Sequence, residues 1–209
     1  MSITKKVIND LMQYSSTDKR KGFHPFFKTG KGEYGEGDKF VGISVPEVRS
    51  VAKKYFKSSS LADTELLMKN KIHEVRLCAL MIMVYQYETY EKSHDDSAQK
   101  QIFDLYLSNK EYINNWDLVD LSCYKIVGER LLKTKDWEFL IKLANSKSLW
   151  ERRIAMISTF AFIKAKNIKP TIAIAEILLM DKHDLIQKAV GWMLRELGKR
   201  VGKSSNRIS

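Results

Sequence analysis

Helix-breaking residues are scarce in this sequence, and long apolar stripes run between them. Only three prolines occur, Pro25, Pro46 and Pro170. Between them, apolar residues recur at the three- and four-residue spacing that lines one face of an α-helix. The clearest stripes are Ile3, Val7, Ile8 and Leu11; Leu77, Leu80, Met81 and Val84; and Ile186, Val190, Met193 and Leu197. Sustained alternation of apolar and polar residues is absent, so the sequence predicts an all-α protein.

Helix boundaries are also marked in the sequence. Ser44-Val-Pro-Glu47 and Ser148-Leu-Trp-Glu151 have the form of a capping box, in which a serine and a glutamate satisfy the first free N–H groups. Other expected boundaries are Pro170 opening a helix to Met180, Asn114 or Asn115 capping a helix from Trp116 to Val127, and Gly198 near the end of the last helix.

Three apolar segments, 75–87, 152–164 and 186–200, follow the same design, with a polar or basic turn before an apolar helix. Their early basic residues Arg76, Arg153 and Lys188 are separated by roughly one or two periods of about 38 residues, which is typical of HEAT-like helix pairs. We therefore expect a HEAT-like helical repeat solenoid, an α-α superhelix with a concave basic cleft. It would form a single domain over residues 1–209, with an irregular tail over 200–209.

Composition excludes several classes of protein. No stretch approaches the roughly 18 apolar residues of a membrane span, and the N-terminal MSITKKVIND lacks the apolar core of a signal peptide. We expect a cytoplasmic protein. Cys78 and Cys123 lie in apolar runs and indicate buried thiols. The four histidines are scattered, so neither a metal site nor a cofactor is expected.

The net charge of +11 suggests a polyanionic partner. The charge is uneven, because residues 146–209 contain thirteen Lys and Arg against five Asp and Glu. Charge alone leaves open a solvated basic surface with no partner.

The segment 26–42, FFKTGKGEYGEGDKFVG, interrupts the helical pattern with five glycines. It carries Lys28, Lys31 and Lys39 among aromatic residues that include Phe27. Such a loop can approach a phosphate backbone closely, although it can equally be a flexible connection between helices. It matches neither of the glycine-rich nucleotide-binding patterns, so it does not indicate nucleotide binding.

Three groups of residues are candidates for chemistry or for contact with DNA. Trp116 and Asp120 lie four residues apart and would share one helix face. A carboxylate is a poor neighbour for a core indole, although a surface or capping aspartate beside a core tryptophan remains the alternative. Lys188, Trp192, Arg195 and Lys199 form a stripe that suits contact with a phosphate backbone, or else a tryptophan at the edge of the core. Arg152 and Arg153 begin a helix and suit phosphate contact or a simple surface pair.

Four segments together resemble the DNA alkylation repair family, the AlkD type of HEAT-like repeat glycosylase. These segments are KTGKGEYGEGDKFVGISVPEVR (28–49), NNWDLVDLS (114–122), LWERRIAM (149–156) and IQKAVGWMLRELGKR (186–200). The likeness runs from about Phe26 to Arg200.

The resemblance implies roles for particular residues. Trp116 and Trp192 would hold the damaged nucleotide and its sugar. Asp120 would stabilise charge at the deoxyribose and position a water, and Arg153 would hold a backbone phosphate. A tyrosine of some family members is replaced here by Phe27, which puts any role of that hydroxyl in doubt.

The implied function is excision of N3- or N7-alkylated purines from double-stranded DNA by a DNA glycosylase, and because the sequence carries no strong self-association motif we expect a monomer. Such bases are cationic, so no acid is needed to protonate them, and a fixed carboxylate can stabilise the oxocarbenium-like sugar. The resemblance also implies that the damaged base need not be flipped into a pocket, as most glycosylases require. The alternatives are a non-catalytic DNA-binding repeat protein and a protein scaffold that meets an acidic partner.

Overall fold

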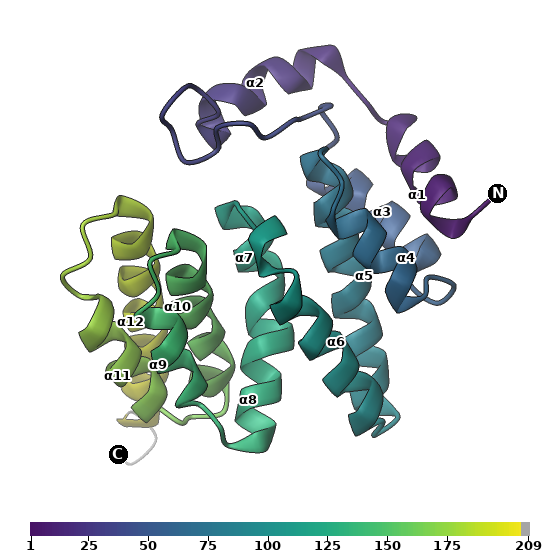
Figure 1. Ribbon diagram of the computed structural model, residues 1–209. Coiled ribbons are helices and arrows are strands. Elements are labelled where there is room, and N and C mark those ends of the chain that lie inside the picture. The colour runs from purple at the N-terminus through teal and green to yellow at the C-terminus, as the bar shows by residue number, and fades with distance from the viewer. Residues whose placement is uncertain (206–209) are drawn as a thin grey trace. The chain divides into compact units, whose positions relative to one another are not determined.

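The computed structural model describes residues 1–205, and helices account for nearly all of its regular structure (Figure 1). Within these residues the only strand-like feature is a single isolated bridge between Lys39 and Ile72. The all-α prediction is confirmed. The chain divides into two compact units, residues 1–118 and 119–209.

The first unit is built around α5. Its helices are α1 (Ile3–Met12), α2 (Thr17–Phe27), α3 (Val45–Tyr55), α4 (Leu61–Met68), α5 (His73–Lys92), α6 (Asp96–Ser108), the short η1 (Lys110–Tyr112) and the beginning of α7 (Trp116–Cys123). Helix α5 packs against α3, α4 and α6, and most of its residues are buried. A helix that is apolar on nearly all sides is the expected centre of a helical unit.

The second unit is built in the same way around α10. It contains the end of α7, the π-helical turn η2 (Tyr124–Gly128), α8 (Glu129–Thr134), α9 (Phe139–Ala144), α10 (Leu149–Lys164), α11 (Lys169–Leu178) and α12 (Asp184–Ser205). Helix α10 packs against η2, α9, α11 and α12. The predicted repeat segments 75–87, 152–164 and 186–200 thus fall on α5, α10 and α12. The solenoid arrangement and the concave basic cleft stay predictions.

The predicted capping box forms fully at Ser44 and Glu47 but only in part at Ser148, whose backbone N–H donates to Ser146 Oγ instead of to Glu151. The backbone N–H of Ser44 donates to Glu47 Oε2 at 2.7 Å, and Ser148 Oγ accepts from the N–H of Glu151. The Ser44 hydrogen bond and the Lys19 ammonium lower the pKa of Glu47 to about 2. A side-chain oxygen of Asn115 accepts from the N–H of Trp116, where α7 begins.

Three boundaries differ from the predictions. Helix α7 ends at Cys123 and passes into the π-helical turn, rather than continuing unchanged to Val127. Helix α11 ends at Leu178, two residues before the predicted end. Helix α12 continues through Gly198 to Ser205, so residues 200–205 of the predicted irregular tail are helical, while 206–209 lie outside the described residues. Nothing crowds Gly198, and a glycine without a positive φ angle does not by itself end a helix.

Candidate functional site

The carboxylate of Asp120 is held by the guanidinium of Arg153, both within the second unit. Arg153 Nε lies 2.9 Å from Asp120 Oδ1, and Nη2 lies 2.7 Å from Oδ2. Nη1 donates to the backbone carbonyl of Leu185. A two-point fork of this kind fixes both the position and the plane of a carboxylate. Asp120 keeps partial solvent exposure, whereas Arg153 is only 5% exposed.

The local sequence explains why the carboxylate stands there. Helix α7 begins at Trp116, so Asp120 follows one turn later, and after Cys123 the backbone widens into η2. Single π-helical turns inside helices occur frequently at functional sites. The Arg153 side chain comes from the start of α10, the central helix of the second unit.

These contacts give Arg153 a clear structural role, which is to hold Asp120. Its predicted contact with a backbone phosphate stays a prediction. Arg152 is similarly engaged, because its Nε lies 2.6 Å from Asp181 Oδ2 and its Nη1 donates to the carbonyls of Ser146 and Lys147. The predicted phosphate contact of Arg152 is likewise untested.

Aromatic side chains connect α12 to η2 in the second unit. The half-buried ring of Trp192 lies 6.4 Å from that of Phe160, which meets Tyr124 edge-on at 5.3 Å. Lys188 and Arg195 are exposed on the same helix as Trp192, as the stripe predicted. Lys188 pairs with Asp184 at 3.1 Å, a surface ion pair that costs little to exchange for another partner.

A second aromatic cluster lies in the first unit around Trp116. The rings of Phe27 and Trp116 are stacked with centroids 5.5 Å apart, and Phe40 stacks on Phe27 at 4.6 Å. Phe27 is only 8% exposed, so it packs inside the unit. Its predicted DNA contact is untested, and the geometry supports a packing role instead.

The exposed ring at this place is that of Phe26, which sequence reasoning did not select. It is 60% exposed and meets Trp116 edge-on at 5.5 Å. Adjacent phenylalanines alternate between exposure and burial according to helix phase, and α2 contains Pro25, which obscures that phase in the sequence.

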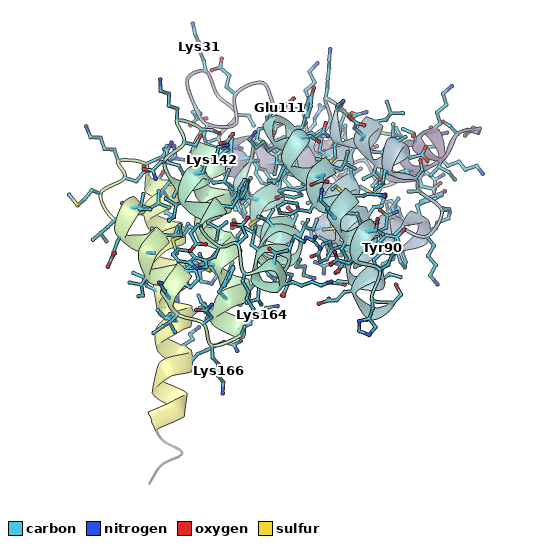
Figure 2. All side chains as sticks on the ribbon, turned by 60° about the horizontal axis from the view of Figure 1, so that its bottom comes forward. Lys31, Tyr90, Glu111, Lys142, Lys164 and Lys166 are labelled. Atoms are coloured by element: carbon cyan, nitrogen blue, oxygen red, sulfur yellow. The ribbon has the colours of Figure 1, made fainter. Side chains whose placement is uncertain are left out.

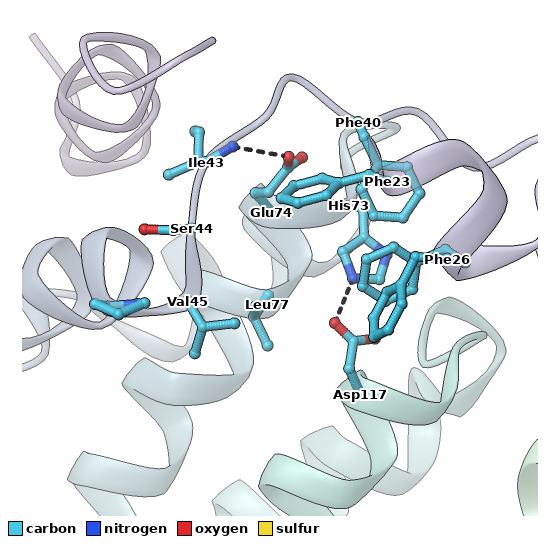
Figure 3. Close-up of a pocket in the computed structure, with 12 residues that line it drawn as sticks. Phe23, Phe26, Phe40, Ile43, Ser44, Val45, His73, Glu74, Leu77 and Asp117 are labelled. Atoms are coloured by element: carbon cyan, nitrogen blue, oxygen red, sulfur yellow. Dashed lines mark hydrogen bonds and ion pairs between the residues drawn. The ribbon is translucent and has the colours of Figure 1, made fainter. Parts of the chain in front are cut away.

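The same cluster borders a pocket of about 320 Å³ that the sequence did not predict. Four phenylalanines line it together with side chains of α5 and α7. Figure 3 shows Phe23, Phe26 and Phe40 around this pocket. The lining comprises Phe23, Phe26, Phe27, Phe40, Ile43, Ser44, Val45, Pro46, His73, Glu74, Leu77 and Asp117. Its members come from residues 23 to 117, so only the tertiary fold reveals the pocket.

The three lysines predicted to meet DNA, Lys28, Lys31 and Lys39, are all exposed on the connection between α2 and α3. Figure 2 shows Lys31 pointing away from this loop. The backbone N–H groups of Gly30 and Gly32 are bound by the carboxylates of Glu33 and Glu36. Contact with phosphate at this loop would therefore come from the lysine side chains rather than from these two N–H groups.

Close packing explains one of the glycines of the loop. Gly42 has a φ angle of 82°, and a Cβ atom there would lie 2.1 Å from the carbonyl oxygen of Ser16. Only glycine combines this backbone conformation with so close an approach. The loop is thus fastened against the start of α2.

Residues 7–205 match the family of DNA alkylation repair enzymes. The chain belongs to this family. The fold of a predicted DNA alkylation repair enzyme from Enterococcus faecalis is similar, with a TM-score of 0.68 over 92% of this chain and 87% of that chain at 16% sequence identity. No curated protein sequence matches this chain. Membership of the DNA alkylation repair family assigns the protein a role in repairing alkylated DNA.

Among residues 1–205, no helix is both long and apolar enough to cross a membrane. Within the same residues, no three His, Cys, Asp or Glu side chains gather as a metal site would require. Cys78 and Cys123 are buried and unbridged, and burial raises the pKa of the Cys78 thiol to about 12.

Proposed function

We propose that the protein is a DNA glycosylase that removes cationic N3- or N7-alkylated purines from double-stranded DNA. The observation that carries the proposal is the Asp120 carboxylate, which a buried guanidinium orients while leaving it partly open to solvent. A protein that only bound phosphates would gain nothing from a fixed negative charge beside its basic side chains.

The carboxylate suits the chemistry of a cationic leaving group. When the N-glycosidic bond breaks, its electron pair leaves with the base, which becomes neutral, and positive charge develops on the sugar. A carboxylate fixed near C1′ stabilises that charge without having to reorganise during the reaction. Water then adds at C1′ and loses a proton, which Asp120 is suited to accept. The products are the free base and an abasic site.

The other predicted residues have supporting roles in this proposal. Trp116 and Trp192 offer indole faces, which attract cationic groups by roughly 0.5–2 kcal/mol. The exposed cations meet the DNA backbone; they are Lys28, Lys31, Lys39, Lys188 and Arg195. Arg153 holds the carboxylate, and Phe27 supports the indole of Trp116. The reaction consumes only water, so no cofactor or metal is required.

The test is release of free base from methylated double-stranded DNA by the wild-type protein. We expect free 7-methylguanine or 3-methyladenine in the supernatant, and an equal number of abasic sites in the DNA. DNA binding by folded protein without any released base would replace the glycosylase proposal with that of a non-catalytic DNA-binding protein. Absence of both would favour a protein scaffold.

A further inference from the structure

A buried histidine in the first unit lies between two carboxylates. His73 Nδ1 is 2.9 Å from Asp38 Oδ2, and Nε2 is 2.8 Å from Asp117 Oδ2. All three side chains are at least nine-tenths buried. Asp38 comes from the connection between α2 and α3, His73 from the start of α5, and Asp117 from the first turn of α7. Figure 3 shows the contact with Asp117 beside the aromatic pocket.

The geometry requires a particular protonation state. Because ionised carboxylates only accept hydrogen bonds, both ring nitrogens of His73 must donate, and the ring is an imidazolium. Burial alone would lower the pKa of His73, but Asp117 and Asp38 outweigh it and raise the pKa to about 9. The pKa of Asp38 is lowered despite its burial, because His73 and Arg76 both favour its charged form.

The carboxylates of Asp38 and Glu74, close to the His73 ring, also accept hydrogen bonds from other groups. Arg76, also on α5, donates to Asp38 Oδ1, and Asn115 donates to Asp38 Oδ2 at 3.3 Å. The neighbouring carboxylate of Glu74 accepts from the backbone N–H groups of Val41, Gly42 and Ile43. The start of α5 therefore fastens the whole end of the loop that carries Phe40.

His73 reaches Trp116 by two routes. Through the rings, His73 stacks on Phe40 at 4.4 Å, Phe40 on Phe27 at 4.6 Å, and Phe27 on Trp116 at 5.5 Å. Through the backbone, His73 binds Asp117, the residue that directly follows Trp116. The indole of Trp116 is thus held at the face of its ring, and the helical turn that carries it is held as well, so it has few alternative orientations.

We propose that His73 is a positioning residue for Trp116, which it holds through the ring stack and through Asp117. The effect of His73 on base release rests on the function proposed above. The effect on the orientation of Trp116 does not, since it is a property of the free protein. The two claims can therefore fail separately.

If His73 holds Trp116 in this way, the surroundings of Trp116 change at alkaline pH. When His73 loses its proton, one of its two carboxylate contacts loses its donor, and the positive charge that lies between Asp38 and Asp117 is removed. Because the pKa rises from 6.5 unfolded to about 9 folded, this stabilisation is complete below pH 6.5. It decreases as the pH rises and is lost above the folded-state pKa of about 9.

The experiment follows Trp116 emission in the free protein between neutral pH and pH values of about 10. Subtracting the spectrum of a Trp116→Phe variant isolates this indole from the other three tryptophans. We expect a transition with a midpoint near pH 9 in the wild type. The transition should be missing in His73→Gln. It should be unchanged in the control variant His183→Gln, which replaces a half-exposed histidine of the second unit in the same way. The same transition in His73→Gln, or none in the wild type, would overturn the proposal.

Two further measurements keep the test decisive. If His73→Gln does not fold, Asp38→Asn replaces it. Because this variant lacks one of the two carboxylates, the midpoint of its transition should lie at a lower pH than that of the wild type. A midpoint equal to that of the wild type contradicts the proposal. If base release is found, His73→Gln should slow the single-turnover rate by roughly 10- to 100-fold, the scale of an ångström-sized displacement, with DNA affinity nearly unchanged. An unchanged rate would refute the role of His73 in catalysis.

Discussion

Two arginines, Arg76 on α5 and Arg153 on α10, each bind a carboxylate from a different part of the same unit. Both guanidinium groups are almost fully buried, and both stand near the start of the central helix of their unit. Removing one partner of such a pair leaves a buried charge without compensation, which typically costs about 3–5 kcal/mol. Of these two arginines only Arg153 was predicted to meet DNA, and at the residue level it holds a carboxylate, whereas the predicted Lys28, Lys31, Lys39, Lys188 and Arg195 are exposed.

The neighbours Phe26 and Phe27 should respond differently to truncation. Phe27→Ala removes a buried ring from the stack on Trp116 and should lower the free energy of unfolding by about 3–5 kcal/mol. Phe26→Ala removes a ring that is 60% exposed, so stability should change by less than about 1 kcal/mol. Denaturant unfolding of both variants checks this. Equal destabilisation would show that the two rings do not have the burial described.

At the level of helices, the π-helical turn η2 depends on one glycine. A Cβ atom on Gly128 would lie 2.4 Å from the carbonyl oxygen of Ser158 on α10. Gly128→Ala should therefore force η2 away from α10 and destabilise the protein by roughly 1–3 kcal/mol.

Gly198 on α12 provides the matched control, because no atom crowds its Cβ position. There the same change should stabilise the helix by about 0.5–1 kcal/mol through helix propensity. The measurement is the free energy of unfolding of both variants. A Gly128→Ala variant as stable as Gly198→Ala would contradict the close packing of η2 on α10.

The helices were predictable because their signals are local. The apolar period of α5, the serine before α10 and the proline at the start of α11 all act within a few residues. The ion pairs could not be predicted from local signals, because Arg153 and Asp120 are 33 residues apart in the chain and Arg76 and Asp38 are 38 residues apart. The sequence indicated Trp116 and Asp120 as candidates, but not what holds either one. The length of α12 was underestimated because Gly198 resembled a helix end, although the helix runs on to Ser205.

At the level of the whole molecule, the net charge of +11 should make DNA binding strongly dependent on salt. If about four phosphates are contacted, affinity should fall by about 100-fold between about 50 and about 200 mM salt. Arg195→Gln should make the slope of log affinity against log salt concentration shallower by the amount expected for about one phosphate contact. Lys100→Gln, which removes the same charge from α6, should leave that slope unchanged. A slope that is the same in both variants would exclude Arg195 from the DNA interface.

The role of Asp120 in breaking the glycosidic bond is tested by the single-turnover release of base by Asp120→Asn. Its control is Asp181→Asn, which removes a carboxylate from a comparably buried pair with Arg152. We predict that Asp120→Asn binds methylated DNA normally but releases base at least about 100-fold more slowly than the wild type, while Asp181→Asn remains within a few-fold. Equal rates for Asp120→Asn and the wild type would show that the Asp120 carboxylate takes no part in base release.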